Sequence, residues 1–442
     1  MKTNLLARCS LLLVTFCAQG CGAGFSSATS NESPPAPLPA AAPLPNETDA
    51  RAQALRWLEA RVKGDPDDIV AQNKLGGYYL EQMRETGNLT FLELAVRAAQ
   101  ASLKSVPAEL NRGGLSLLAQ TEFASHNFAA TRDHAQQLMQ LDGGKSYPYQ
   151  LLGDAQLELG DYEAATASFQ KLAQLAPNDF ATETRLARLA ALRGDHARER
   201  GHYENALRAA LSAVPPARET VAWCRWQLGE TAFNTGDYAT AEQHYRAALV
   251  TFPDYYRALG GLARTRAARG DLNEAIALYQ QTTQRLPDPV FVAALGDLYQ
   301  LTGRAKEADA QYELCEQMAR LGTAGGQLYN RQLALFYADH DLKAAEAYQL
   351  AQREYAARHD IYGADALAWT ALKADKLNEA QKASKEALRL GTQDAKLFYH
   401  AGLIARAAGN QAAARDYLQR ALKLNPQFDP LQARHAAEAL AH

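Results

Sequence analysis

A spacing of 34 residues relates two stretches of this chain to themselves. A fixed period of 20–50 residues is typical of repeat arrays, in which each unit buries its apolar face only by stacking on its neighbours. The period therefore predicts an array whose core is spread along an axis. The recurring positions are Gly236, Ala241, Tyr245 and Pro253 with Gly270, Ala275, Tyr279 and Pro287, and Ala368, Ala380 and Ala387 with Gly402, Ala414 and Ala421.

The residues at these positions predict a pair of antiparallel helices in each unit. Small residues such as Gly229 and Ala241 let two helices approach closely, where a large side chain would overpack the contact. Gly236 ends the first helix because glycine readily takes the left-handed cap conformation. Tyr245 fills the volume that the small residues leave, and Pro253 closes the second helix because it has no N–H group to continue it.

This pattern resembles the tetratricopeptide repeat family, with copies at Trp223–Tyr255, Ala395–Asp429 and Ser146–Asp179. The resemblance implies an all-α fold, a right-handed superhelical solenoid of antiparallel helix pairs over residues 49–442. We expect about ten units, with capping helices at Asp49–Val62 and Leu431–Ala441. The expected units are 69–110, 112–145, 146–179, 180–220, 222–255, 256–288, 289–325, 326–360, 361–394 and 395–428.

Three of the expected units depart from the pattern. The first contains about seven extra residues around Met83–Thr90, and the fourth contains a similar extension through Arg193–Arg200. The eighth has lost its turn glycine and reads Asp339-His340-Asp341.

The sequence of the N-terminal segment predicts that the protein is exported. Residues 1–20 combine a charged start with an apolar stretch too short to span a bilayer, which is typical of a signal peptide. Ala18-Gln19-Gly20-Cys21 resembles the lipobox of bacterial lipoproteins, which implies lipidation of Cys21; ordinary cleavage after Gly20 is the alternative. Residues 21–48 are rich in Pro, Ala and Ser and predict a flexible tether to the cell envelope.

Nothing in the sequence predicts catalysis, a metal site or a cofactor. The net charge of −3 and pI near 6.4 leave no basic stripe for nucleic acid. The histidines lack the spacing of a zinc hydrolase site, and no CxxC pair or phosphate-binding loop occurs. Cys224 and Cys315 fall in non-adjacent units, so we expect them unpaired and buried.

A groove remains as the candidate site, because in the tetratricopeptide family the first helix of each unit lines a concave face that binds peptides. Aromatic side chains recur in interface hot spots. Several of these residues could instead pack between adjacent units. The Lys/Asn clamp for chaperone C-termini and the asparagine ladder of sugar transferases are both absent. The predicted groove residues are Tyr147, Trp223, Trp226, Glu230, Phe233, Arg264, Asp297, Tyr362, Asp365, Trp369, Lys373, Tyr399 and Arg406.

The sequence therefore predicts an exported, lipid-anchored, non-enzymatic scaffold that binds a protein or peptide partner at a bacterial envelope. One alternative is an accessory subunit of a machine that exports or modifies envelope polysaccharide. A third reading is a sensor or enzyme subunit whose catalytic partner is a separate chain.

Overall fold

The computed structural model describes residues 37–44, 48–324 and 331–441. The chain divides into two units, Met1–Pro39 and Ala40–His442. The signal peptide, Cys21 and most of the tether lie outside the described residues, so the fold below is that of the second unit. None of the described helices is both long and apolar enough to cross a membrane.

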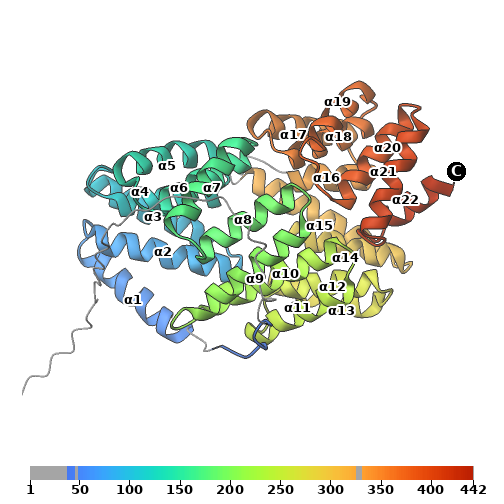
Figure 1. Ribbon diagram of the computed structural model, residues 1–442. Coiled ribbons are helices and arrows are strands. Elements are labelled where there is room, and N and C mark those ends of the chain that lie inside the picture. The colour runs from blue at the N-terminus through green and yellow to red at the C-terminus, as the bar shows by residue number, and fades with distance from the viewer. Residues whose placement is uncertain (1–36, 45–47, 325–330, 442) are drawn as a thin grey trace, which may run out of the picture. The chain divides into compact units, whose positions relative to one another are not determined.

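The described residues form helices and no strand, which confirms the predicted all-α solenoid of helix pairs. Consecutive helices pack on one another along the array, as α2 does on α3 and α10 on α11, and α1 and α22 lie at the two ends of the array (Figure 1). The helices are α1 (Thr48–Gly64), α2 (Ile69–Thr86), α3 (Thr90–Ser105), α4 (Arg112–Ala124), α5 (Phe128–Asp142), α6 (Tyr147–Glu158), α7 (Tyr162–Leu175), α8 (Phe180–Leu192), α9 (His196–Ser212), α10 (Arg218–Asn234), α11 (Tyr238–Thr251), α12 (Tyr256–Ala268), α13 (Leu272–Arg285), α14 (Pro289–Leu301), α15 (Ala305–Ala324), α16 (Arg331–Asp339), α17 (Ala344–Ala357), α18 (Ile361–Lys373), α19 (Leu377–Ala387), α20 (Ala395–Ala407), α21 (Gln411–Leu424) and α22 (Gln432–Ala441).

Close packing within each pair depends on the small residues that the sequence repeats. A Cβ atom on Gly229 would lie 2.7 Å from Cδ1 of Tyr245 on the partner helix, well inside van der Waals contact. In the same way, a Cβ atom on Gly153 would lie 2.6 Å from Cδ1 of Phe169. Both rings are fully buried, so the aromatic side chain of the second helix occupies the space that a larger first-helix residue would fill.

The turns inside the pairs correct one expectation from the sequence. Gly194 and Asp195 form the turn between α8 and α9, 34 residues after Gly160, so no extension lies at Arg193–Arg200. The next turn glycine, Gly236, follows 42 residues later, and the extra length falls in α9, α10 and their linker. In the pair α16–α17, Asp341 takes the left-handed conformation, with φ 54°, in place of the missing glycine.

First helices of successive pairs also contact one another, and this defines the inner side of the array. Helix α4 contacts α6, α6 contacts α8, α10 contacts α12, and α14, α16, α18 and α20 contact in series. Among the described residues, second helices of successive pairs make no contact of similar extent. Because first helices crowd together and second helices spread apart, the array curves with its first helices on the concave face.

Residues about 200 positions apart meet at three places within this unit, and we call these contacts the closure. The turns after α6, α8 and α10 dock on the linkers before α18, α20 and α22. At the first place, the Ile361 amide donates to the Tyr162 hydroxyl at 2.8 Å. At the third, Asn425 Nδ2 donates to the Phe233 carbonyl at 2.8 Å, near the C-terminal end of α10.

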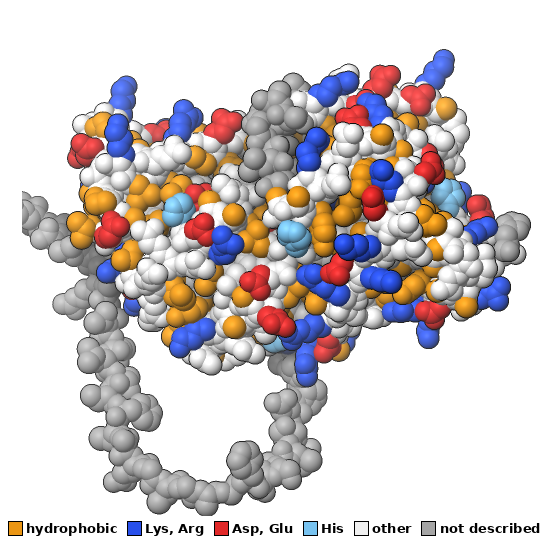
Figure 2. All heavy atoms as spheres, turned by 90° about the horizontal axis from the view of Figure 1, so that it is seen from above, with side chains coloured by type: hydrophobic (Ala, Val, Ile, Leu, Met, Phe, Trp, Pro, Cys, Tyr) orange, Lys and Arg blue, Asp and Glu red, His pale blue; other side chains and the backbone are white. Residues whose placement is uncertain are grey.

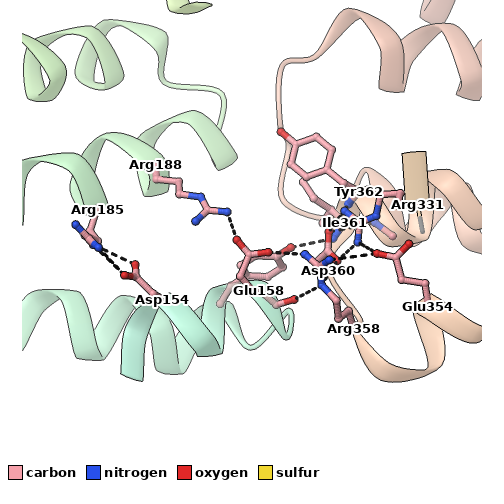
Figure 3. Close-up of polar contacts among 12 residues, drawn as sticks. Asp154, Glu158, Arg185, Arg188, Arg331, Glu354, Arg358, Asp360, Ile361 and Tyr362 are labelled. Carbon is pink, nitrogen blue, oxygen red and sulfur yellow. Dashed lines mark hydrogen bonds and ion pairs between the residues drawn. The ribbon is translucent and has the colours of Figure 1, made fainter. Parts of the chain in front are cut away.

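A charged network surrounds the first closure contact (Figure 3). Glu158 at the end of α6 lies between Arg188 of α8 and Arg358 of the α17–α18 linker and forms an ion pair with each. Burial raises the pKa of Glu158, but the two guanidinium groups outweigh it and hold the pKa below its usual value. The carboxylate therefore stays ionised and joins the two halves of the array.

Candidate functional site

Acid–base pairs link first helices of different repeats along the inner side of the array. In one of them, Arg264 of α12 donates to Glu230 of α10 at 2.7 Å. Since each charge has a partner, most polar groups of the inner side are satisfied within the protein. The pairs are Asp154–Arg185 at 2.6 Å, Glu230–Arg264 at 2.7 Å, Asp297–His340 at 2.7 Å and Asp365–His400 at 2.9 Å.

A cavity of about 320 Å³ interrupts this inner side between α12, α14, α16 and α20. Its apolar lining includes Ala293 and Ala294 of α14, Phe336 of α16 and Phe428 of the α21–α22 linker. Its polar wall includes Asp297, Asp339, His340, Lys396, Asp429 and Arg264 of α12. Four first helices and the linker that leads to the C-terminal cap thus contribute to one mixed pocket.

Hydrogen bonds fix two of the three carboxylates in this cavity. Asp297 accepts from the Tyr312 hydroxyl at 2.8 Å and contacts His340 Nε2 at 2.7 Å. Asp339 accepts from Lys396 Nζ at 3.1 Å. Within the described part of the chain, the third carboxylate, that of Asp429, accepts only from backbone N–H groups, those of residues 431 and 432, at 3.0 and 2.9 Å.

The pKa shifts follow from these partners. Burial lowers the pKa of His340, but Asp297 outweighs burial and holds that pKa above its usual value. Burial raises the pKa of Asp339, but Lys396 reverses this and leaves it below its usual value. Burial also raises the pKa of Asp429. The attraction of Lys396 does not outweigh burial, so this pKa stays above its usual value.

Three of the predicted groove aromatics lie in the core. Phe233 is 1% exposed, and Trp369 and Tyr399 are each 2% exposed. Trp369 donates from Nε1 to Asp339 at 2.8 Å and stacks on His400 with ring centroids 4.4 Å apart. These rings pack between adjacent repeats, because neighbouring first helices approach too closely to leave them open to solvent.

The other predicted aromatics lie at different depths. Tyr362 on α18 is 40% exposed and is the most open of the set. Tyr147 is half-buried and donates to Asp142 at 2.9 Å. Trp223 and Trp226 are also half-buried: Trp223 packs edge-on against two aromatic rings of the preceding repeat, and Trp226 lies under the Arg257 guanidinium at 5.1 Å.

The predicted polar groove residues mostly pair within the array. Glu230 and Arg264 form one of the acid–base pairs, and Asp297 and Asp365 belong to two others. Arg406 is exposed near the C-terminal cap. Lys373 lies over the Trp369 ring, 4.5 Å from its centroid. Their roles in partner binding stay predictions.

Sequence reasoning predicted two residues of the cavity lining, Arg264 and Asp297, and missed the rest of its polar wall. His340 and Asp339 were noted only because their repeat lacks a turn glycine, and Lys396 and Asp429 carry no motif at all. These four residues come from two repeats and a linker that the sequence does not place together. No spacing within one repeat could have identified them.

Metal and thiol chemistry has no assembled site in the described part of the chain. It contains no cluster of three or more metal-ligating side chains. Cys224 and Cys315 are free and buried, and burial raises the pKa of both thiols. Acidic and basic side chains are interspersed on the face drawn in Figure 2, without a continuous basic stripe.

Three family models match the sequence, each described as a tetratricopeptide repeat, at residues 147–179, 232–298 and 366–427. The chain contains tetratricopeptide repeats. The matched segments coincide with the pair α6–α7, the stretch from the end of α10 through α14, and the pairs α18–α21. No curated protein matches the sequence.

Two solved structures illustrate the similarity of this repeat array to others. PilW, a widely conserved type IV pilus biogenesis factor, has a TM-score of 0.40 and 16% identity over 46% of this chain and 91% of its own. YrrB, a tetratricopeptide protein with an unusual peptide-binding site, has a TM-score of 0.30 and 15% identity over 41% of this chain and 90% of its own.

Proposed function

We propose that this protein is a non-enzymatic scaffold that holds a protein or peptide partner against the concave face of its tetratricopeptide array. The observation that carries the proposal is the cavity of about 320 Å³ on the inner side, where apolar and charged walls meet. Pockets that combine an apolar lining with a few fixed polar groups are the usual form of a binding site. The exposed ring of Tyr362 adds a second contact surface on a first helix.

Replacement of Tyr362 with alanine tests the groove. We expect partner affinity to fall about tenfold or more, because exposed aromatic anchors often contribute about 2 kcal/mol to an interface. The melting temperature should change little, since truncation of an exposed ring leaves no buried cavity. Affinity is measured by titration with the partner identified through photocrosslinking from position 362 in the producing cell.

Trp57→Ala is the matched control, because Trp57 is 58% exposed on the capping helix α1, outside the first helices that line the groove. It should leave partner affinity unchanged. Equal loss of affinity in both variants, or none in Tyr362→Ala, would count against binding at the concave face.

We further propose that the scaffold is exported and anchored at the bacterial cell envelope through a lipid on Cys21. Stable membrane attachment needs more than a single acyl chain, and bacterial lipoproteins carry several. Cys21→Ser should therefore release the array into the soluble envelope fraction or leave an unprocessed precursor. Fractionation and acyl labelling check this, and a wild-type protein that is soluble and unlabelled would contradict it.

A further inference from the structure

We propose that the cavity between α12, α14, α16 and α20 binds a basic side chain, lysine or arginine, of the partner polypeptide. This inference rests on the proposed scaffold function and names the chemistry that one part of its groove recognises. It follows from the size of the cavity, its apolar wall and its balance of charges.

The size and lining suit a long aliphatic side chain. About 320 Å³ lies at the lower end of the range for ligand pockets, roughly 300–1,000 Å³. Its apolar lining includes Ala293 and Ala294 of α14, Phe336 of α16 and Phe428. Lysine and arginine carry a methylene stem that packs on such a surface while the charged end reaches a polar group.

The charges of the cavity leave an excess of one carboxylate. Its carboxylates are Asp297, Asp339 and Asp429, of which the first two contact His340 and Lys396. Asp429 forms no ion pair with any described residue, although Lys396 lies near enough to act on it electrostatically. Because Glu230 neutralises Arg264, the cavity carries about one net negative charge when His340 is protonated.

An anionic group would fit this cavity poorly. The cations at its wall, Lys396 and Arg264, already donate to Asp339 and Glu230, so an anion would have to compete for them. It would also meet the carboxylates of Asp297 and Asp429. A cation instead finds a carboxylate that has only backbone donors, and it relieves the repulsion that helps hold the pKa of Asp429 above its usual value.

Saturation-transfer NMR on the full chain tests the proposal with three small probes. N-acetyl-lysinamide carries the basic side chain, N-acetyl-norleucinamide keeps the alkyl stem without the charge, and N-acetyl-glutamate amide carries the opposite charge. We expect the lysine probe to bind about tenfold more tightly than the norleucine probe, and the glutamate probe more weakly still. Equal binding of the lysine and norleucine probes, or preference for glutamate, would overturn the inference.

Two variants locate the binding. Asp429→Asn keeps an oxygen that can cap α22 but removes the charge. It should lower the affinity for the lysine probe about tenfold. Asp416→Asn is the control, because Asp416 is an exposed carboxylate on α21, and it should change nothing. Ala294→Phe fills the cavity and should abolish binding of both the lysine and norleucine probes. Binding that survives both Asp429→Asn and Ala294→Phe would overturn the assignment to this cavity.

These results separate the inference from the proposed function. A partner that still requires Tyr362, together with no preference for the lysine probe, would leave the scaffold standing and reject the basic side chain. The opposite outcome is a preference for the lysine probe that depends on Asp429, with no partner bound through Tyr362. It would support the cation site and reject the scaffold function.

Discussion

Gly160→Ala is expected to destabilise the array by roughly 2–5 kcal/mol. Gly160 has φ +83°, and a side chain in that conformation costs about 1–2 kcal/mol. A Cβ atom there would also collide with the His359 carbonyl and lie 2.8 Å from the Asp360 nitrogen, so the closure must separate or shift, which adds about 1–3 kcal/mol. Urea unfolding measures the change in free energy. Hydrogen exchange should rise at the Ile361 amide, which donates to Tyr162 across the closure.

Gly270→Ala is the matched control for this experiment. Gly270 has nearly the same backbone conformation, φ +88°, but a Cβ atom on it meets nothing within 4 Å. Gly270→Ala should lower the unfolding free energy only by the conformational cost, about 1–2 kcal/mol. Hydrogen exchange at the Ile361 amide should stay unchanged. Equal destabilisation by the two variants would mean that the contact between residues 160 and 359 adds nothing to stability.

Trp369→Ala is expected to cost about 3–5 kcal/mol of unfolding free energy. The ring is fully buried between α18 and α20, and its removal leaves a cavity beside His400 and strips Asp339 of a hydrogen-bond donor. Calorimetry or urea unfolding reports the loss. Local exchange should rise most in α16, α18 and α20, because contacts in a repeat array are mainly between neighbours.

Trp57→Ala provides the comparison, since that ring is largely exposed and its loss should shift stability by no more than about 0.5 kcal/mol. The contrary outcome is that Trp369→Ala lowers the unfolding free energy as little as Trp57→Ala and weakens partner binding. That result would assign Trp369 to the groove as a contact residue.

Packing within each repeat was predictable from the sequence. The approach of Gly229 to Tyr245, and of Gly153 to Phe169, follows from residues only 16 positions apart that recur at a fixed period. The turn that lacks glycine was also visible, although the use of Asp341 in the left-handed conformation was not. The extension expected at Arg193–Arg200 was misplaced because the length of α9 and α10 is set by packing rather than by a local turn signal.

The groove was less accessible to sequence reasoning. The resemblance predicts that first helices line the groove, but periodicity cannot distinguish a ring that lines a groove from one that packs between two first helices. Trp369 and Tyr362 lie on the same helix, one buried and one exposed, because their neighbours in the next repeats differ. The polar lining pairs residues from successive repeats, as Glu230 does with Arg264, and this depends on how each repeat sits on the next.

The sequence by itself determined the helix pairs, their order and the fold class, because each of these depends on contacts between residues close in the chain. Only the tertiary structure decided the closure, the buried tryptophan and the cavity around Asp429. The closure joins residues 160 and 359, whose meeting depends on small rotations summed over several repeats. No single repeat encodes that sum, so the closure could not be predicted from the period alone.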